Sequence, residues 1–265
     1  MLNLFKIEWM KVRSYRAFWV LFGAFVILFP LSFYYSASKY MERADSRPEQ
    51  VLKAMLGNPF QYPGAWLSSS WFGGIFFVMI GMLFILLVTN EVQYRTHRQN
   101  IIDGWSRLDF LLAKFTMLLF FVVVSTLVVF LCGLWIGSLY SPSGTSITKG
   151  IYYLGYFALM ATMYLVVAYV IAILVKRTGL SIIIYFAFVC LIDNLLWLVL
   201  TRNGSQGGYF LPVESTDSLV PNPFKPKALE KRTLTDMTLI ITASGYIIVF
   251  CYFIKQYFQR IDLKT

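Results

Sequence analysis

Residues 66–89 read WLSSSWFGGIFFVMIGMLFILLVT, a run of 24 residues that contains no Asp, Glu, Lys or Arg. A helix rises about 1.5 Å per residue, so this run is long enough to cross a hydrocarbon core of roughly 30 Å. Inside hydrocarbon the backbone must satisfy its own hydrogen bonds, which favours a helix. The segment therefore predicts a membrane-spanning helix.

The composition of the whole chain agrees with a membrane protein. Of its 265 residues, 58% are hydrophobic and 14% charged, and the mean hydropathy of +0.66 lies outside the range of soluble domains. We expect an all-α integral membrane protein with a single domain over residues 1–265. The six predicted spans are 17–38, 66–89, 108–140, 150–175, 180–200 and 236–254.

The side chains needed for common active sites are scarce. The three cysteines lie in apolar runs without a CxxC spacing, and His97 is the single histidine. This pattern argues against a disulfide framework, a zinc site and a haem. The spans also contain no HExxH or GxSxG motif and no paired catalytic acids. We therefore expect no catalytic, cofactor-binding or metal-binding residues on this chain.

The positive charges are spread over the flanks of the spans. With both termini in the cytoplasm, the inner segments and their flanks carry 13 Lys and Arg against five Asp and Glu, and the outer loops carry 10 against seven. The short turn 176–179 contains two basic residues and no acid. This asymmetry favours cytoplasmic termini. The net charge of +10 is thus explained by topology and anionic lipid rather than by nucleic acid.

The segment before the first span has the pattern of an amphipathic helix. An interfacial helix along the inner membrane surface fits this mixture. The alternative is a basic flank that only orients the first span. The predicted apolar stripe consists of Leu2, Phe5, Trp9 and Val12, with Lys6 and Arg13 beside it.

A polar stretch, NEVQYRTHRQNIIDGWSR, follows the second span as residues 90–107. Glu91 and Arg95 are four residues apart in the favourable acid-first order, which predicts a short helix over about 91–102. Asp103 and Gly104 then indicate its end, because glycine accepts the left-handed conformation found just past many helices. Residues 90–107 are therefore expected to form a short helix and a glycine break between the second and third spans, an arrangement called the elbow below.

The elbow has two interpretations. It is either a well-capped loop in solvent or a rigid lever toward a cytoplasmic partner, and the spacing alone does not separate them. As a lever it would present Tyr94, Arg95, His97, Arg98 and Gln99.

At this point the sequence resembles the permease subunits of type-2 ABC exporters. That family has an N-terminal helix that is both basic and apolar, followed by six spans. A cytoplasmic segment after the second span carries a recurring pattern: an acidic residue, then a threonine, a basic residue, a Ser-Arg pair and finally a lysine. The N-terminal FKIEWMKVRSYRAFW also resembles the amphipathic helix of that family. The matching positions after the second span are Glu91, Thr96, Arg98, Ser106, Arg107 and Lys114.

The resemblance implies a cytoplasmic coupling helix within residues 90–107 that docks on a separate ABC ATPase subunit. It also implies export, a second permease copy or homologue, and a bacterial cytoplasmic (inner) membrane. The chain has no GxxxxGK[ST] motif, so ATP and Mg are expected on the partner ATPase. The implied ATPase-coupling residues are Glu91, Arg95, Thr96, Arg98, Asp103, Gly104 and Arg107.

Asp193, followed by Asn194, is the one acidic residue deep in a predicted span. An aspartate at the centre of a span costs roughly 2.5 to 3.5 kcal/mol on insertion scales, so such residues are often functional. Three interpretations remain: a transport path or proton relay formed with Asn194, an ion pair with Arg202, or the start of a bend that re-enters the membrane.

Two further features concern packing. Gly133 and Gly137 have the GxxxG spacing that allows close helix contact, either within one bundle or between two copies. The loop 201–235 contains four prolines, which oppose regular structure until Thr233 and Asp236 can cap the last span.

Two other functions remain open at this stage. One is a membrane scaffold that uses the elbow to dock a partner without transport. The other is an ion-coupled transporter that uses Asp193.

Overall fold

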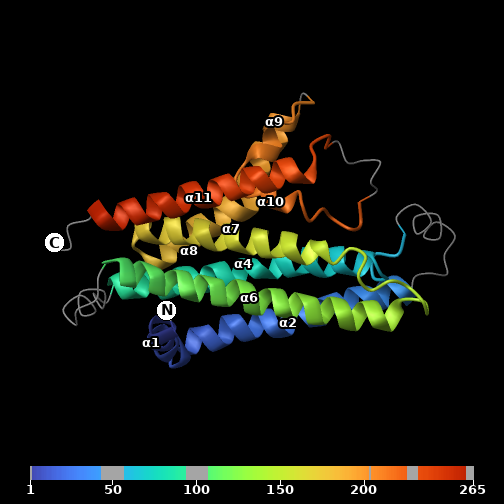
Figure 1. Ribbon diagram of the computed structural model, residues 1–265, viewed down its shortest axis with the longest axis horizontal. Helices are drawn as coiled ribbons and strands as arrows, with labels where there is room; N and C mark the ends of the chain where they lie inside the picture. Colours follow the sequence, from blue (N-terminus) through green and yellow to red (C-terminus); the bar gives the residue numbers. More distant parts are fainter. Residues whose placement is uncertain (1, 43–56, 94–106, 203, 226–231, 261–265) are drawn as a thin grey trace.

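The computed structural model describes residues 2–42, 57–93, 107–202, 204–225 and 232–260. Six stretches of helix in these ranges are long and apolar enough to cross a membrane, which confirms the predicted spans. The helices run side by side along the long axis, with the start of α1 and the end of α11 at the same end of the bundle (Figure 1). The spans are α2 (Arg16–Glu42), α4 (Gly64–Gln93), α6 (Arg107–Tyr140), α7 (Tyr152–Val175), α8 (Thr178–Ala187) with α9 (Asp193–Thr201), and α11 (Asp236–Arg260).

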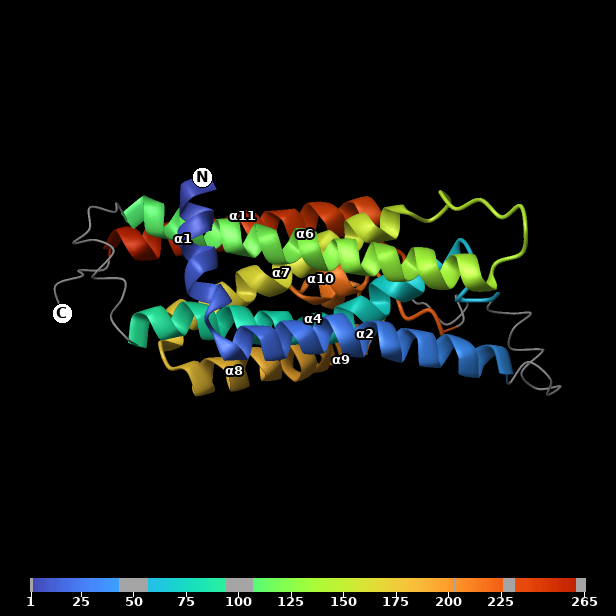
Figure 2. The same ribbon diagram turned by 90° about the horizontal axis from the view of Figure 1, so that it is seen from below.

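The N-terminal segment is a separate helix, α1 (Leu2–Arg13), that runs across the bundle rather than along it (Figure 2). Phe5, Trp9 and Val12 of the predicted stripe pack against the core, and the side chain of Leu2 lies outside the described part. The helix ends where Ser14 Oγ donates to the Lys11 carbonyl at 2.9 Å, which satisfies one of the terminal acceptors.

Helix α4 lies at the centre of the bundle because small residues let its neighbours approach closely. A Cβ added to Gly73 would lie 2.6 Å from Val129 Cγ2 of α6, and one added to Gly81 would lie 2.0 Å from the Tyr185 hydroxyl of α8. Real Cβ atoms do not approach other atoms this closely, so a side chain at either position would force its neighbour to move.

The GxxxG pair of α6 faces the same centre. A Cβ on Gly133 would lie 2.8 Å from Ser69 Oγ and 2.9 Å from Trp66, both on α4. A Cβ on Gly137 would lie 2.4 Å from the ring of Tyr62, whose hydroxyl donates to the Leu134 carbonyl at 3.0 Å. In this structure the two glycines therefore make contacts within one bundle.

We predict that Gly137→Ala lowers the free energy of unfolding by about 1 to 3 kcal/mol, because the buried Tyr62 ring must shift. The measurement is equilibrium unfolding in detergent micelles. Gly155→Ala on α7 is the matched control, since a Cβ there meets nothing within 4 Å. Equal stability of the two variants would contradict the packing role of Gly137.

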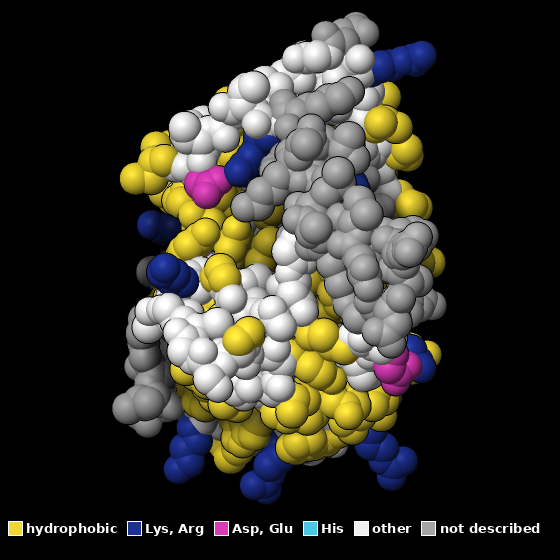
Figure 3. All heavy atoms as spheres, turned by 90° about the vertical axis from the view of Figure 1, so that its right-hand side faces the viewer, with side chains coloured by type: hydrophobic (Ala, Val, Ile, Leu, Met, Phe, Trp, Pro, Cys, Tyr) yellow, Lys and Arg dark blue, Asp and Glu magenta, His cyan; other side chains and the backbone are white. Residues whose placement is uncertain are grey.

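The outer faces of the spans are apolar, as expected where lipid takes the place of water. On α6 the exposed residues Leu119, Val123, Leu127 and Leu131 recur every four residues. Figure 3 looks onto the end of the bundle opposite α1, where hydrophobic side chains cover much of the described surface and charged side chains appear at several separate points.

The fifth span is bent. A π-helical turn, η2 (Phe188–Ile192), separates α8 from α9, and α9 leaves the direction of the other helices (Figure 1). A π-turn places one extra residue in a helix and so changes which side chains face the bundle after it. This geometry agrees with the interpretation of Asp193 as the start of a bend.

The chain then folds back as the return segment, residues 204–225. It contains a 3₁₀ helix, η3 (Gly207–Phe210), and a short helix, α10 (Glu214–Asp217), which packs against α7 and α11. The expectation of no regular structure before the last span was therefore wrong, because tertiary packing stabilises these turns despite the prolines. The start of α11 also differs from the prediction that Thr233 caps the last span. The capping side chain is that of Thr235, whose Oγ1 accepts a hydrogen bond from the Thr238 backbone N–H at 3.4 Å.

Candidate functional site

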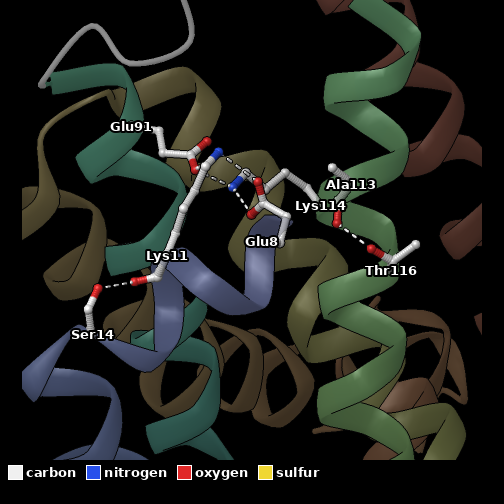
Figure 4. A network of polar contacts seen from close by, with 7 residues as sticks. All are labelled: Glu8, Lys11, Ser14, Glu91, Ala113, Lys114 and Thr116. Carbon is white, nitrogen blue, oxygen red and sulfur yellow. Dashed lines mark hydrogen bonds and ion pairs between the residues drawn. The ribbon is translucent and has the colours of Figure 1, made fainter. Parts of the chain in front are cut away.

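Four charged side chains from three helices meet where α1 crosses the bundle (Figure 4). Lys114 Nζ of α6 lies 2.5 Å from Glu8 Oε2 of α1 and 2.8 Å from Glu91 Oε1 of α4. Lys11 Nζ of α1 lies 3.0 Å from Glu8 Oε1 and 3.2 Å from Glu91 Oε1. Each ammonium bridges both carboxylates, so these four residues form an electrically neutral ion-pair cluster.

The ion-pair cluster is largely buried. The exposed fraction of the side chain is 2% for Glu8, 3% for Lys114 and 11% for Glu91, against 34% for Lys11. Buried charges are tolerated only when they are paired, and removing one partner leaves the other uncompensated. The cluster therefore requires α1, α4 and α6 to stay in register with one another.

The sequence explains how each charge reaches this point. Glu8 falls within the apolar stripe of α1, between Phe5 and Trp9, and so faces the bundle. Glu91 occupies the last turn of α4, and Lys114 lies about two turns into α6. The ends of α4 and α6 flank residues 94–106, so the ion-pair cluster lies at the base of the predicted elbow.

The electrostatics favour the charged forms. Burial alone would raise the pKa of Glu8, but Lys114 and Lys11 outweigh it and hold that pKa below its usual value. Burial would likewise lower the pKa of Lys11, but Glu91 and Glu8 outweigh it and raise that pKa. Both groups therefore stay ionised around neutral pH. The buried hydroxyl of Tyr169 on α7 lies within electrostatic range of Glu91 and Glu8.

The family model for ABC-2 family transporter proteins matches residues 4–193, a range that contains most of α1, the first four spans and all four residues of the ion-pair cluster. This protein belongs to the ABC-2 transporter family. Comparison with curated proteins found no match. Membrane components of ABC-2 transporters typically lack catalytic activity of their own. The described part of the chain contains no group of three or more His, Cys, Asp or Glu that could hold a metal ion.

In this ABC-2 protein the predicted coupling residues fall into three groups. Glu91 continues α4 instead of starting a separate helix, and its described contacts are to the two lysines of the ion-pair cluster. Arg107 is the first residue of α6, and its side chain lies outside the described part. Five predicted residues also lie outside the described ranges: Arg95, Thr96, Arg98, Asp103 and Gly104.

Three members of the cluster, Glu8, Lys11 and Lys114, were not among the predicted coupling residues of the ABC-2 protein. Glu8 carries a recognisable signal, because it is an acidic residue in the middle of an apolar helical stripe. Lys11 follows three residues later, a spacing that places it on the same face. Lys114 appears only as part of the family pattern.

Asp193 is bonded to the backbone of the return segment. Its Oδ2 accepts from the Glu214 N–H at 2.7 Å, and the Val213 N–H lies at the same carboxylate. The predicted ion pair with Arg202 is wrong, since Arg202 is exposed and Asp193 is 2% exposed. Asn194 Nδ2 donates to the Val189 carbonyl at 3.3 Å. A transport path along Asp193 and Asn194 stays a prediction.

Proposed function

We propose that this ABC-2 protein is the permease subunit of an ATP-driven exporter, and that residues 90–107 dock a separate ATPase subunit. The observation that carries the proposal is the ion-pair cluster at the base of that segment. A segment that receives force needs a stiff attachment to the spans that must move. Buried pairs between Glu8, Glu91 and Lys114 supply such an attachment.

In this proposal the subunit that binds and hydrolyses ATP is another chain. This sequence contains no GxxxxGK[ST] phosphate-binding loop, so ATP and Mg would bind to the partner. Closure of two ATPase subunits would push on the elbows of two permease copies. Because the cluster joins α1 to α4 and α6, the push would move the three helices as one body and repack the bundles against each other.

The same proposal places both termini in the cytoplasm of a bacterium and the protein in its inner membrane. The start of α1 and the end of α11 lie at one end of the bundle, as an even number of spans requires (Figure 1). Helix α1 crosses the bundle at that end (Figure 2), an orientation that suits the membrane interface. The excess of Lys and Arg in the predicted inner segments supports the cytoplasmic side.

We predict that Arg98→Glu and Gly104→Pro abolish stimulation of ATP hydrolysis by the permease while the spans stay folded. The charge reversal would oppose docking, and the proline would remove the glycine break between the two halves of the elbow. The measurement is ATPase activity, and the amount of ATPase retained, after purification of the tagged protein from its native membrane.

Arg202→Glu is the matched control, because this exposed arginine lies at the outer end of α9. Hydrolysis and retention that match the wild type in both elbow variants would overturn the coupling assignment. Retention of an ATPase whose activity never responds to substrate would favour the scaffold. Transport driven by a pH gradient without ATP would favour the ion-coupled alternative.

A further inference from the structure

The return segment places acidic side chains against the helices of the bundle. Helix α10 carries Glu214 and Asp217 and lies against α7 and α11 (Figure 1). Its other two residues, Ser215 and Thr216, are fully buried. The segment is therefore inserted among the helices, and its two carboxyl groups, which keep some exposure to solvent, are partly removed from water when it inserts.

The partners of these carboxyl groups are uncharged. Tyr164 of α7 places its hydroxyl 3.0 Å from both carboxylate oxygens of Asp217. Ser218 Oγ donates to Glu214 Oε1 at 2.6 Å. Within the described ranges neither acid forms an ion pair with Lys or Arg. The two acids are thus brought together with no cation in direct contact among the described residues, and Lys225 acts on Glu214 only from beyond ion-pair distance.

A second tyrosine faces the same place and lacks a hydrogen bond. Tyr185 of α8 is 0% exposed, and its hydroxyl has no hydrogen-bond partner among the described residues. It lies over Gly81 of α4 and interacts electrostatically with Asp217. A buried, unpaired polar group is costly, so the Tyr185 hydroxyl is a hydrogen-bonding group available to this site.

The hydrogen-bond inventory indicates what that group is. One Tyr164 hydroxyl has a single proton, yet it lies equally close to both oxygens of Asp217. A protonated Asp217 would both accept from and donate to that hydroxyl. A proton is therefore a ligand that fits the arrangement of the Tyr164 hydroxyl and the two Asp217 oxygens.

We propose that Glu214 and Asp217, together with Tyr164 and Tyr185, form a proton-binding site that fastens the return segment in the bundle. This inference concerns the segment after α9 and does not depend on the proposed ATPase coupling. The other titratable groups around the site are Tyr156 of α7, Cys190 of η2, Asp193 of α9, Lys225, and Asp236 of α11 with its partner Arg232.

The pKa shifts agree with this geometry. Burial raises the pKa of Asp217 well above its usual value, and Glu214 raises it further. Burial also raises the pKa of Glu214 to about 7, against opposing effects of Ser218 and Lys225. The inserted segment therefore binds protons more tightly than the free segment.

The sign of the pH dependence follows from this difference. Insertion is strongest below the ordinary carboxyl pKa and weakens as the pH rises through the raised value. Consider one carboxyl with a pKa of 4.5 in the free segment and about 7 in the inserted segment. Its equilibrium constant for insertion falls by about 30-fold between pH 5.5 and pH 8.

The test is hydrogen exchange of the full chain in lipid nanodiscs at pH 5.5 and pH 8. Protection factors, corrected for intrinsic exchange, are measured for peptides within 207–220 and for α4 as an internal reference. In the wild type we expect a fall of at least about 30-fold in the return segment, since Asp217 adds to the effect of Glu214, and none in α4. The variant E214Q/D217N, which carries neutral amides at both positions, should lose this pH dependence.

Glu42→Gln is the matched control, since this exposed carboxylate at the end of α2 pairs with Lys39. It should keep the pH dependence of the wild type. Wild-type protection that is the same at both pH values would overturn the proposal, even if the double variant fails to fold. An unchanged pH dependence in E214Q/D217N, or in E214Q alone if the double variant is unstable, would overturn it as well.

Discussion

Replacing Lys114 with methionine is expected to lower the free energy of unfolding by about 3 to 5 kcal/mol, the usual cost of leaving buried charges unpaired. Lys114 bridges Glu8 and Glu91, and all three side chains are largely buried. After the substitution only Lys11 remains to balance two carboxylates. Equilibrium unfolding in mixed micelles would measure the change.

A compensating variant separates lost charge from lost packing. In E8M/K114M the pair of Lys11 and Glu91 remains at 3.2 Å, so no charge is left without a partner. We expect this double variant to recover most of the lost stability, because apolar residues of similar volume often replace buried ion pairs without cost.

Lys39→Met is the control for removal of a lysine. Its pair with Glu42 is exposed, and such pairs contribute about 0 to 1 kcal/mol. Wild-type stability in K114M, or a double variant less stable than the single one, would show that the ion-pair cluster does not hold the three helices together.

Replacing Asp193 with alanine is expected to cost about 2 to 6 kcal/mol, since two backbone donors lose their acceptor at roughly 1 to 3 kcal/mol each. These donors are the N–H groups of Val213 and Glu214, through which Asp193 fixes α10 to the start of α9. The same micelle unfolding experiment applies, and limited proteolysis within 204–225 should become faster.

Asp193→Asn provides the comparison, because its amide oxygen can still accept one of these hydrogen bonds. We expect its stability to lie between those of the wild type and the alanine variant. If the asparagine variant is as unstable as the alanine variant, the charge of Asp193 matters more than its bonds to Val213 and Glu214. Retained transport in Asp193→Asn would argue against a proton relay at this residue.

The spans could be predicted because each is a long local signal. Uncharged runs such as 66–89 exceed the thickness of the hydrocarbon, and helices are the structures that satisfy their own backbone there. The bend in the fifth span could not be predicted this way. The bend at the π-turn is accompanied by a hydrogen bond between Asp193 and Glu214, twenty-one residues away, and hydropathy carries no information about such a contact.

The candidate site was predictable only in part. Glu91 and Lys114 follow from the family pattern around the elbow, but their meeting depends on how α4 and α6 return to the same end of the bundle. Glu8 completes the cluster from a helix that crosses the others. A single charge on an apolar stripe indicates that a partner exists, but the sequence does not say which lysine it is.

The π-turn at Phe188–Ile192 also bears on how such a span can evolve. One residue rotates a helix by about 100°, so a single inserted codon is enough to change which side chains face the bundle beyond it. Loss of that codon would join α8 and α9 into one straight span and turn Asp193 away from Glu214. A straight fifth helix and one with a return segment are thus separated by a small genetic step.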